Sequence, residues 1–254
     1  MSGTALDSAV ACYVLALGDD ALVCAQRLCE WATRAPAIEE DVALMNIALD
    51  LLGQARSLLA YAGELEGSGR REDELAYLRD ERDFRNCQLV ELDNGDFATT
   101  MARQLLFSAY QFELYGALSS STDERLSGVA AKAVKEVAYH REHAAGWVVR
   151  LGDGTRESHA RMAAALGTVW PFAGELFEPA APAELVAAGV AAEAPSLQGP
   201  WLSWVTSILS AATLDIPTVT WAPSGGRHGL HTEAFGYLLA EMQHLHRSYP
   251  GATW

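Results

Sequence analysis

Apolar side chains recur at three- and four-residue steps along much of the chain, which is the spacing of one face of an α-helix. The first such stretch predicts a helix over residues 7–33, and the Ala35-Pro36 pair ends it because proline disfavours helical backbone in the preceding residue. The second predicts a helix over residues 38–65. The short link between the two favours an antiparallel helical hairpin. The apolar stripes comprise Tyr13, Leu17, Ala21, Cys24, Leu28 and Trp31 in the first helix, and Leu44, Ile47, Leu51, Ala55 and Leu58 in the second.

The rest of the chain continues the helical pattern, and no segment shows strand-like alternation. Asn94-Gly95-Asp96 is typical of a turn that ends in a helix N-cap, and Thr232 caps the last helix. Pro171 interrupts or kinks one of the expected helices. The further helices are expected over residues 74–78, 83–89, 97–118, 123–151, 158–177, 181–194, 200–214 and 232–249, with a polar connector over 67–71 and a loop over 216–227.

Four long helices with short links and one longer crossover predict an all-α, ferritin-like four-helix bundle with additional C-terminal helices. We expect a single domain over residues 1–254. Its core bundle covers about 7–151 and its accessory helices about 155–254.

The chain has 254 residues, a hydrophobic fraction of 50% and a formal net charge of −15. Such an acidic surface repels phosphate backbones and anionic lipids, so neither nucleic acid nor a membrane is an expected partner. The first residues lack a basic segment followed by an apolar one, and no apolar run reaches the length of a membrane span. We therefore expect a cytoplasmic protein. Its cysteines, Cys12, Cys24, Cys29 and Cys87, show no metal-binding spacing and are interpreted as small buried residues.

Polar residues interrupt the apolar faces of the long helices at the depth where di-iron carboxylate bundles place their ligands. They are Asp19 and Asp20 in the first helix, Asn46, Asp50 and Gln54 in the second, Glu113 in the third, and Lys135, Glu136 and His140 in the fourth. A di-iron bundle needs Glu-x-x-His on two helices and a glutamate on each of the other two. The sequence has one such motif, Glu241-Met242-Gln243-His244, in the last helix, and we interpret it as a chance match.

Other candidates are weaker. The glycine-rich segment 225–229 follows no strand, so it is interpreted as a tight turn and not as a phosphate-binding loop. Surface or loop positions are expected for His143, His159, His228, His231 and His246, and packing roles for Trp170, Trp201, Trp204, Trp221 and Trp254.

Several sequence blocks resemble the C-subunit family of the bacterial phenylacetyl-CoA monooxygenases (1,2-phenylacetyl-CoA epoxidases). They occur in family order from the second helix to the C-terminus. The blocks cover residues 46–56, 79–86, 94–97, 135–140, 150–155, 229–233, 239–243 and 250–254.

The resemblance implies a ferritin-like subunit of a heteromeric complex. In that family a homologous catalytic A subunit holds the di-iron centre and binds the CoA thioester, and a reductase delivers electrons from NADPH. The complex epoxidises the aromatic ring with O₂ in aerobic phenylacetate breakdown. Where catalytic homologues carry the two Glu-x-x-His motifs, this chain has Leu51 and Gln54 in one and Val137 and His140 in the other. Both glutamates and one histidine are missing.

The leading hypothesis is therefore a non-catalytic structural subunit, without a cofactor of its own, that pairs with the A subunit and contacts the other subunits or itself. In place of the metal we expect a buried polar cluster of Asp50, Gln54, Lys135, Glu136 and His140. Two alternatives stay open. One is an active di-iron or other metal-binding oxygenase that uses residues such as Glu113 or the Glu241/His244 pair. The other is a homo-oligomeric helical scaffold.

Overall fold

The computed structural model describes residues 3–252, with side chains from residue 6 onward, and every regular element in that range is a helix. This confirms the predicted all-α, ferritin-like class. Met1, Ser2, Thr253 and Trp254, and with them the end of the 250–254 block, lie outside the described residues. The longer helices are α1 (Gly3–Cys29), α2 (Ile38–Glu66), α4 (Phe97–Leu118), α5 (Glu124–Gly152), α6 (Arg156–Val169), α8 (Ala194–Ala211) and α9 (Glu233–Ser248). The short ones are α3 (Glu72–Tyr77), α7 (Ala183–Ala187) and the 3₁₀ segments η1 (Glu81–Asp83), η2 (Gln88–Glu91), η3 (Trp170–Phe177) and η4 (Gly226–His228).

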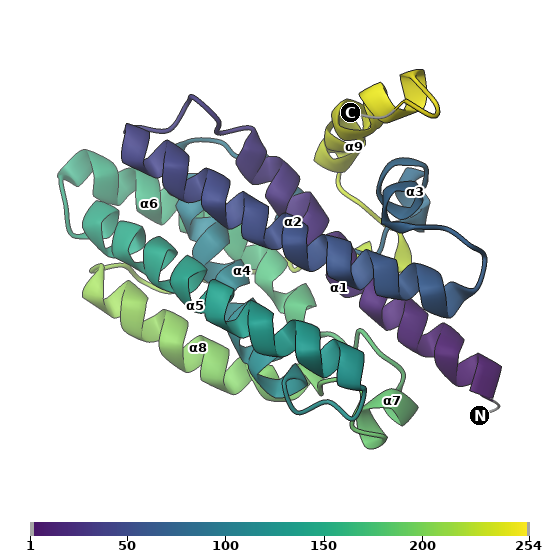
Figure 1. The fold of residues 1–254 in the computed structure, drawn as a ribbon. Helices are drawn as coiled ribbons and strands as arrows, with labels where there is room; N and C mark the ends of the chain where they lie inside the picture. Colours follow the sequence, from purple (N-terminus) through teal and green to yellow (C-terminus); the bar gives the residue numbers. More distant parts are fainter. Residues whose placement is uncertain (1–2, 253–254) are drawn as a thin grey trace. The chain divides into compact units, whose positions relative to one another are not determined.

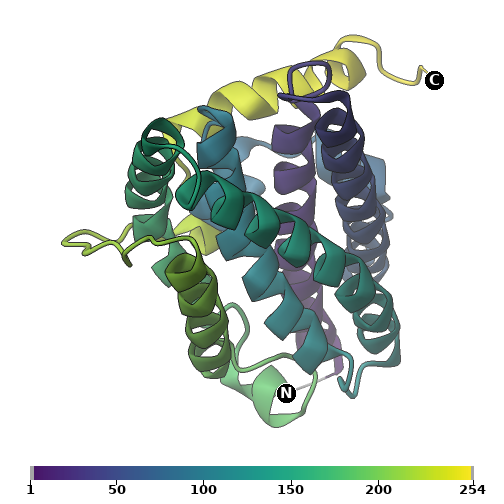
Figure 2. The same ribbon diagram turned by 90° about the vertical axis from the view of Figure 1, so that its left-hand side faces the viewer.

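The chain divides into two compact units. The first comprises Met1–Asp93, Ala180–Leu185 and Gly225–Trp254, and the second Asn94–Pro179 and Val186–Ser224. Each unit contains one pair of long helices, α1 with α2 in the first and α4 with α5 in the second (Figures 1 and 2). The expectation that residues 1–254 form one domain stays a prediction.

In the first unit, α1 and α2 form the predicted antiparallel hairpin (Figure 1). The inner face of α2 buries Leu44, Ile47, Leu51 and Leu58, as its periodicity predicts. Gly18 allows a close approach of the two helices, because a Cβ atom there would lie 2.9 Å from Cδ2 of Leu59.

In the first unit, the C-terminal helix α9 packs against the segment that follows α2. Helix α9 contacts α3, η1, η2 and α1. It buries Phe235, Leu238 and Leu239, and the rings of Phe84 and Phe235 meet edge to face at 5.3 Å between centroids. Helix α9, near the C-terminal end of the described chain, therefore shares a core with the segment that follows α2.

In the second unit, α4 contacts α5, α6 and α8. The side chain of Asp96 caps α4 by accepting the backbone N–H of Thr99, which confirms the predicted N-cap. The bounds of α4 are those predicted, Phe97–Leu118. Trp201 is buried, with its indole Nε1–H donating to the carbonyl of Leu106 at 2.9 Å.

Some element bounds differ from the predictions. The first helix ends at Cys29 and not at Thr33, because residues 30–33 turn away with a left-handed Thr33 (φ 68°). The expected helix over 158–177 begins at Arg156 and gives way at Trp170, beside Pro171, to the 3₁₀ segment η3. Helix α8 begins six residues earlier than expected and contains Pro200. No α-helix forms over 83–89, where residues 84–87 are non-helical chain between η1 and η2.

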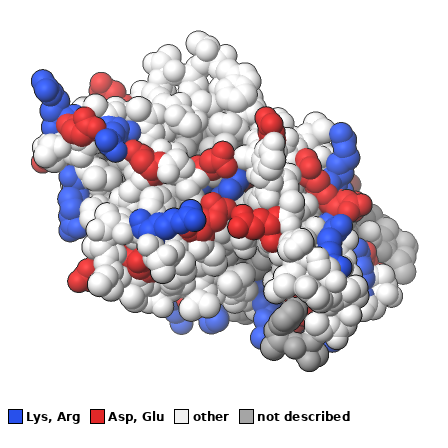
Figure 3. All heavy atoms as spheres, turned by 90° about the horizontal axis from the view of Figure 1, so that it is seen from above, with Lys and Arg blue, Asp and Glu red and all other residues white. Residues whose placement is uncertain are grey.

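Helices α1 and α2 are long and apolar enough to cross a membrane by length and composition. In α1, 78% of the most apolar window is buried inside the protein, which is typical of a core helix. Figure 3 shows Lys and Arg beside Asp and Glu on the visible face, so the net negative charge forms no single acidic patch there. The expectation of buried cysteines is wrong for Cys12, which is exposed.

Candidate functional site

The four positions that the family resemblance aligns with metal ligands of catalytic homologues are all buried. In the first unit, Leu51 and Gln54 occupy the inner side of α2. In the second unit, Val137 and His140 occupy the buried side of α5. The family resemblance therefore identified interior positions.

These residues do not fit a di-iron centre. Leucine and valine offer no donor atom, and the amide of Gln54 is neutral, so the carboxylate charge that di-iron bundles supply is missing. Among residues 6–252, no group of three or more histidine, cysteine, aspartate or glutamate side chains is placed to hold a metal ion.

The five residues of the expected polar cluster belong to different units and have different environments. Gln54 and His140 are buried, Asp50 and Glu136 are half-buried, and Lys135 is exposed. The expected buried position of Lys135 is wrong, because this residue is exposed. A joint buried network stays a prediction for the remaining four.

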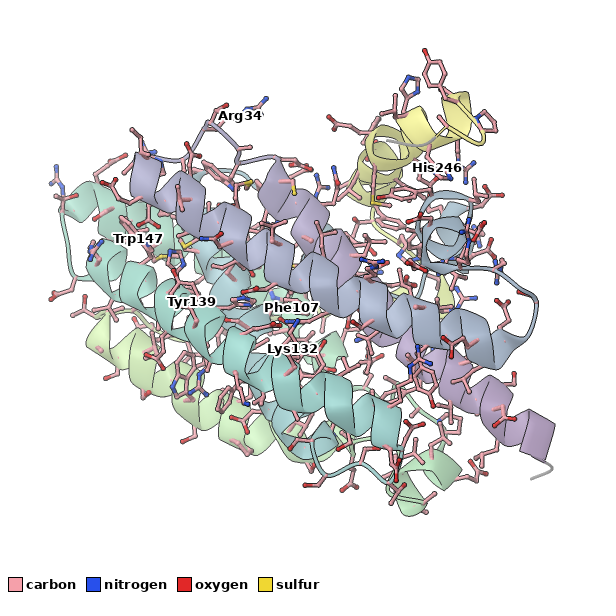
Figure 4. All side chains as sticks on the ribbon, in the orientation of Figure 1. Arg34, Phe107, Lys132, Tyr139, Trp147 and His246 are labelled. Carbon is pink, nitrogen blue, oxygen red and sulfur yellow. The ribbon has the colours of Figure 1, made fainter. Side chains whose placement is uncertain are left out.

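Glu136 forms an ion pair on the surface of α5. Its carboxylate lies 3.2 Å from Nζ of the exposed Lys132, one helical turn earlier. Lys132 and Tyr139 both lie along α5 (Figure 4), and the Tyr139 ring lies 6.0 Å from that of His143. These contacts are ordinary i, i+4 neighbours on a helix surface.

The remaining metal candidates also lack the required geometry. Glu241 and His244 are both exposed on α9, which agrees with the interpretation of their motif as a chance match. Glu113 of α4 faces Arg141 of α5, with 3.9 Å between carboxylate and guanidinium. That guanidinium is held between the rings of Phe112, at 3.6 Å, and Trp204, at 4.5 Å.

The acidic residues in the middle of α1 have structural partners in the first unit. The carboxylate of Asp19 forms a two-pronged ion pair with Arg79, with Oδ2 at 2.9 Å from Nη1. It also accepts the backbone N–H of Arg85 at 2.8 Å. The guanidinium donates further to the carbonyl of Asp83 and lies 4.0 Å above the ring of Phe84. Asp19 therefore fixes the segment between α3 and η2 to α1.

Asp20 makes a second buried ion pair, with Arg227 of η4, at 2.6 Å. Its other oxygen accepts the backbone N–H of Cys87 at 2.7 Å. Arg227 also donates to the carbonyls of Arg85 and Ala16. Burial raises the pKa of the Asp20 carboxyl, and the positive charge of Arg227 opposes that rise.

Glu91 is the centre of a third buried cluster. Its Oε1 lies 2.5 Å from Nδ1 of His231 and accepts from Nδ2 of Asn86, and its Oε2 accepts both the N–H and the hydroxyl of Thr232. The other ring nitrogen of His231 faces the carbonyl of Phe84 at 3.2 Å. His231 lies in the loop before α9, as expected, but a surface position is wrong, because its side chain is fully buried.

We call these three groups, centred on Asp19–Arg79, Asp20–Arg227 and Glu91–His231, the ion-pair network of the first unit. The carbonyl of Glu91 also accepts from Nε and Nη2 of Arg27, which extends the network along α1. Sequence reasoning identified Asp19 and Asp20 but missed Arg79, Arg227, Glu91 and His231. No local signal could have found these four, because their partners lie about 60 to 210 residues away in the chain.

Two comparisons with known proteins show what this chain is similar to. The family model described as "Phenylacetic acid catabolic protein" matches residues 2–254. The chain is 46% identical, over 243 residues, to the C subunit of the 1,2-phenylacetyl-CoA epoxidase of Escherichia coli (strain K12). The matched region covers 95% of this chain and 98% of the relative.

Proposed function

Because the chain belongs to the phenylacetic acid catabolic protein family, we propose that it is the non-catalytic C subunit of a phenylacetyl-CoA epoxidase in aerobic phenylacetate breakdown. In this role it supports a homologous catalytic subunit that carries the di-iron centre. The chain has no metal or other cofactor of its own, and it acts in the cytoplasm with protein partners, without nucleic acid or membrane.

The observation that carries this proposal is the chemistry of the four ligand positions. By the family resemblance, Leu51 and Val137 stand where catalytic homologues carry the two glutamates of the Glu-x-x-His motifs, and both side chains are buried. An iron pair in a carboxylate bundle needs these glutamates to neutralise its charge. A partner subunit must therefore provide the centre that activates O₂.

The ion-pair network supports a structural role. Charges taken from water are tolerated only when they are paired and hydrogen-bonded, and such pairs favour one specific arrangement of the chain in several proteins. Here they hold residues 79–91 and 225–232 against α1. The sequence blocks 79–86 and 229–233 thus contain residues that fix the fold, and a fixed fold is what a supporting subunit requires.

The experiment is to measure iron in this chain purified alone from iron-replete cells, and in its complex with the co-expressed catalytic subunit. We expect iron only in the complex. A second arm measures epoxidation of phenylacetyl-CoA by the catalytic subunit and its reductase, with and without this chain. We expect turnover to depend on the chain.

Two results would overturn the proposal. Stoichiometric iron in the isolated chain would make it an oxygenase in its own right. Failure of the chain to bind the catalytic subunit, together with turnover that does not need it, would remove it from the complex.

A further inference from the structure

A hollow of about 430 Å³ opens in the first unit, between the first half of α1 and the last turns of α2. These two helix segments lie beside each other, and α3 follows α2 after a short loop (Figure 1). Small-molecule sites usually have volumes of about 300–1,000 Å³ and mostly apolar walls with a few polar groups. The hollow therefore has the size of a ligand site. We call it the α1–α2 hollow.

Apolar side chains from three helices form most of its wall. Two of them are small, Ala11 of α1 and Ala62 of α2, and both are buried. A longer side chain at either position would occupy the space itself. Leu75 of α3 is also buried, and Leu15 and Leu65 are half-buried. This wall favours a ligand with an apolar body, because burial of apolar surface is the main source of its affinity.

The charged side chains at the hollow are two carboxylates, Asp7 and Glu66. Glu66 is paired: it accepts from Nε of Arg70 at 3.0 Å and from the hydroxyl of Ser68 at 3.1 Å. The hydrogen bond from Arg70 holds the pKa of the Glu66 carboxyl below its usual value, so this group stays ionised. Asp7 is exposed, and its carboxylate makes no ion pair within the described part of the chain. Asp7 therefore supplies the negative charge that no arginine offsets.

This charge selects among ligands with an apolar body. No lysine, arginine or histidine is among the described residues that line the hollow, so an anionic head group would meet only like charge. The net charge of −15 on the chain adds to that repulsion. A neutral ligand would leave the carboxylate of Asp7 without a partner, whereas an ammonium group would pair with it.

We propose that the α1–α2 hollow binds a small organic cation, with its apolar body against Ala11, Ala62 and Leu75 and its ammonium group beside Asp7. This inference goes beyond the proposed function and does not depend on it.

The test titrates the full chain by calorimetry, near neutral pH, with octylammonium, octanol and octanoate. These three compounds share one apolar body and differ in the charge of the head group. We expect one octylammonium per chain, bound about threefold to fivefold more tightly than octanol, which is the scale of an exposed ion pair. Octanoate should bind more weakly than octanol. Affinity for octanoate equal to that for octylammonium would overturn the proposal.

Two variants with matched controls test the named contacts. Ala62→Leu fills the hollow and should weaken octylammonium binding at least about tenfold, because several methylene groups lose their burial. Ala240→Leu, at an exposed position of α9, should bind as the wild type does. Asp7→Asn should abolish the preference for octylammonium over octanol, and Glu39→Gln, exposed at the other end of α2, should retain it. Thermal unfolding shows whether each variant is folded.

The thiol of Cys12 locates the ligand in the wild-type chain, without any substitution. Cys12 lines the hollow and is the exposed one of the four cysteines. We expect bound octylammonium to slow its reaction with an aromatic disulfide reagent, and the chromophore released gives the rate. An unchanged rate at saturating octylammonium would overturn the assigned site, as would wild-type affinity in Ala62→Leu. Absence of saturable binding by the wild type would overturn the proposal as a whole and leave the proposed function standing.

Discussion

The Nδ1 atom of His231 lies 2.5 Å from Oε1 of Glu91, and both side chains are fully shielded from solvent. Glu91 accepts three further hydrogen bonds, from Asn86 and Thr232, so its carboxylate acts as an acceptor throughout. The second ring nitrogen of His231 faces a carbonyl oxygen, which can only accept. Both ring nitrogens of His231 therefore face oxygen atoms, and the ring is held between Glu91 and the carbonyl of Phe84.

The first prediction concerns this pair. His231→Gln removes the ring that is held between Glu91 and the carbonyl of Phe84, and we expect the free energy of unfolding to fall by about 3 kcal/mol. Glu91→Gln should cost a similar amount, and the double variant less than the sum of the two. Urea unfolding of the three variants measures these terms. His228→Gln, at an exposed histidine, is the control. Additive costs in the double variant would show that the two side chains are not coupled.

The second prediction is the pH dependence of Asp20. Burial raises its pKa above the ordinary value of 3.8, so the folded chain holds this proton at pH values where the unfolded chain has released it. The contribution of Asp20 to stability therefore decreases as pH rises from about 4 through the raised pKa. Asp20→Asn abolishes this slope. We expect the stability of the wild type minus that of the variant to fall with pH in this window, as measured by urea unfolding at several pH values. A rise with pH would mean that Arg227 outweighs burial.

The third prediction tests Arg141 in the second unit. Its guanidinium is held between Phe112 and Trp204, and burial lowers its pKa. Trp204→Leu keeps an apolar side chain but removes one of the two aromatic faces, so we expect a loss of about 1 kcal/mol. Thermal unfolding gives the value, and the same change in an Arg141→Met background should cost less. Equal costs in both backgrounds would assign the loss to apolar packing alone.

The fourth prediction compares two glycines of α2. A Cβ atom at Gly63 would clash with the carbonyl oxygen of Arg70, whereas Gly53 has open space. Gly63→Ala must displace the chain after α2 and should destabilise the protein by about 2 kcal/mol. Gly53→Ala should stabilise the isolated chain by about 0.5–1 kcal/mol, because it removes only backbone freedom. Chemical unfolding of the two variants side by side measures both. A Gly63→Ala protein as stable as the wild type would show that the carbonyl oxygen of Arg70 does not lie against Gly63.

The sequence by itself determined most of the long helices. Apolar spacing depends only on local periodicity, so α2, α4 and α5 agree with their predictions to within a residue or two. The resemblance likewise places Leu51 and Val137 where catalytic homologues carry ligand glutamates, and this correspondence stays a prediction. Errors appeared where local signals are weak, as at Trp170, where a proline-linked 3₁₀ segment replaces the α-helix.

Only the tertiary structure decided the roles of the polar residues. Asp19 and Asp20 were visible in sequence as acids in mid-helix, but their arginine partners lie 60 and 207 residues away and come together only in the folded first unit. The same holds for His231, whose carboxylate partner Glu91 lies 140 residues away in the chain. The α1–α2 hollow also emerged from the fold, because its wall comes from three helices and periodicity does not show where their side chains leave space between them. Periodicity is local, whereas pairing and exposure depend on which distant segments meet.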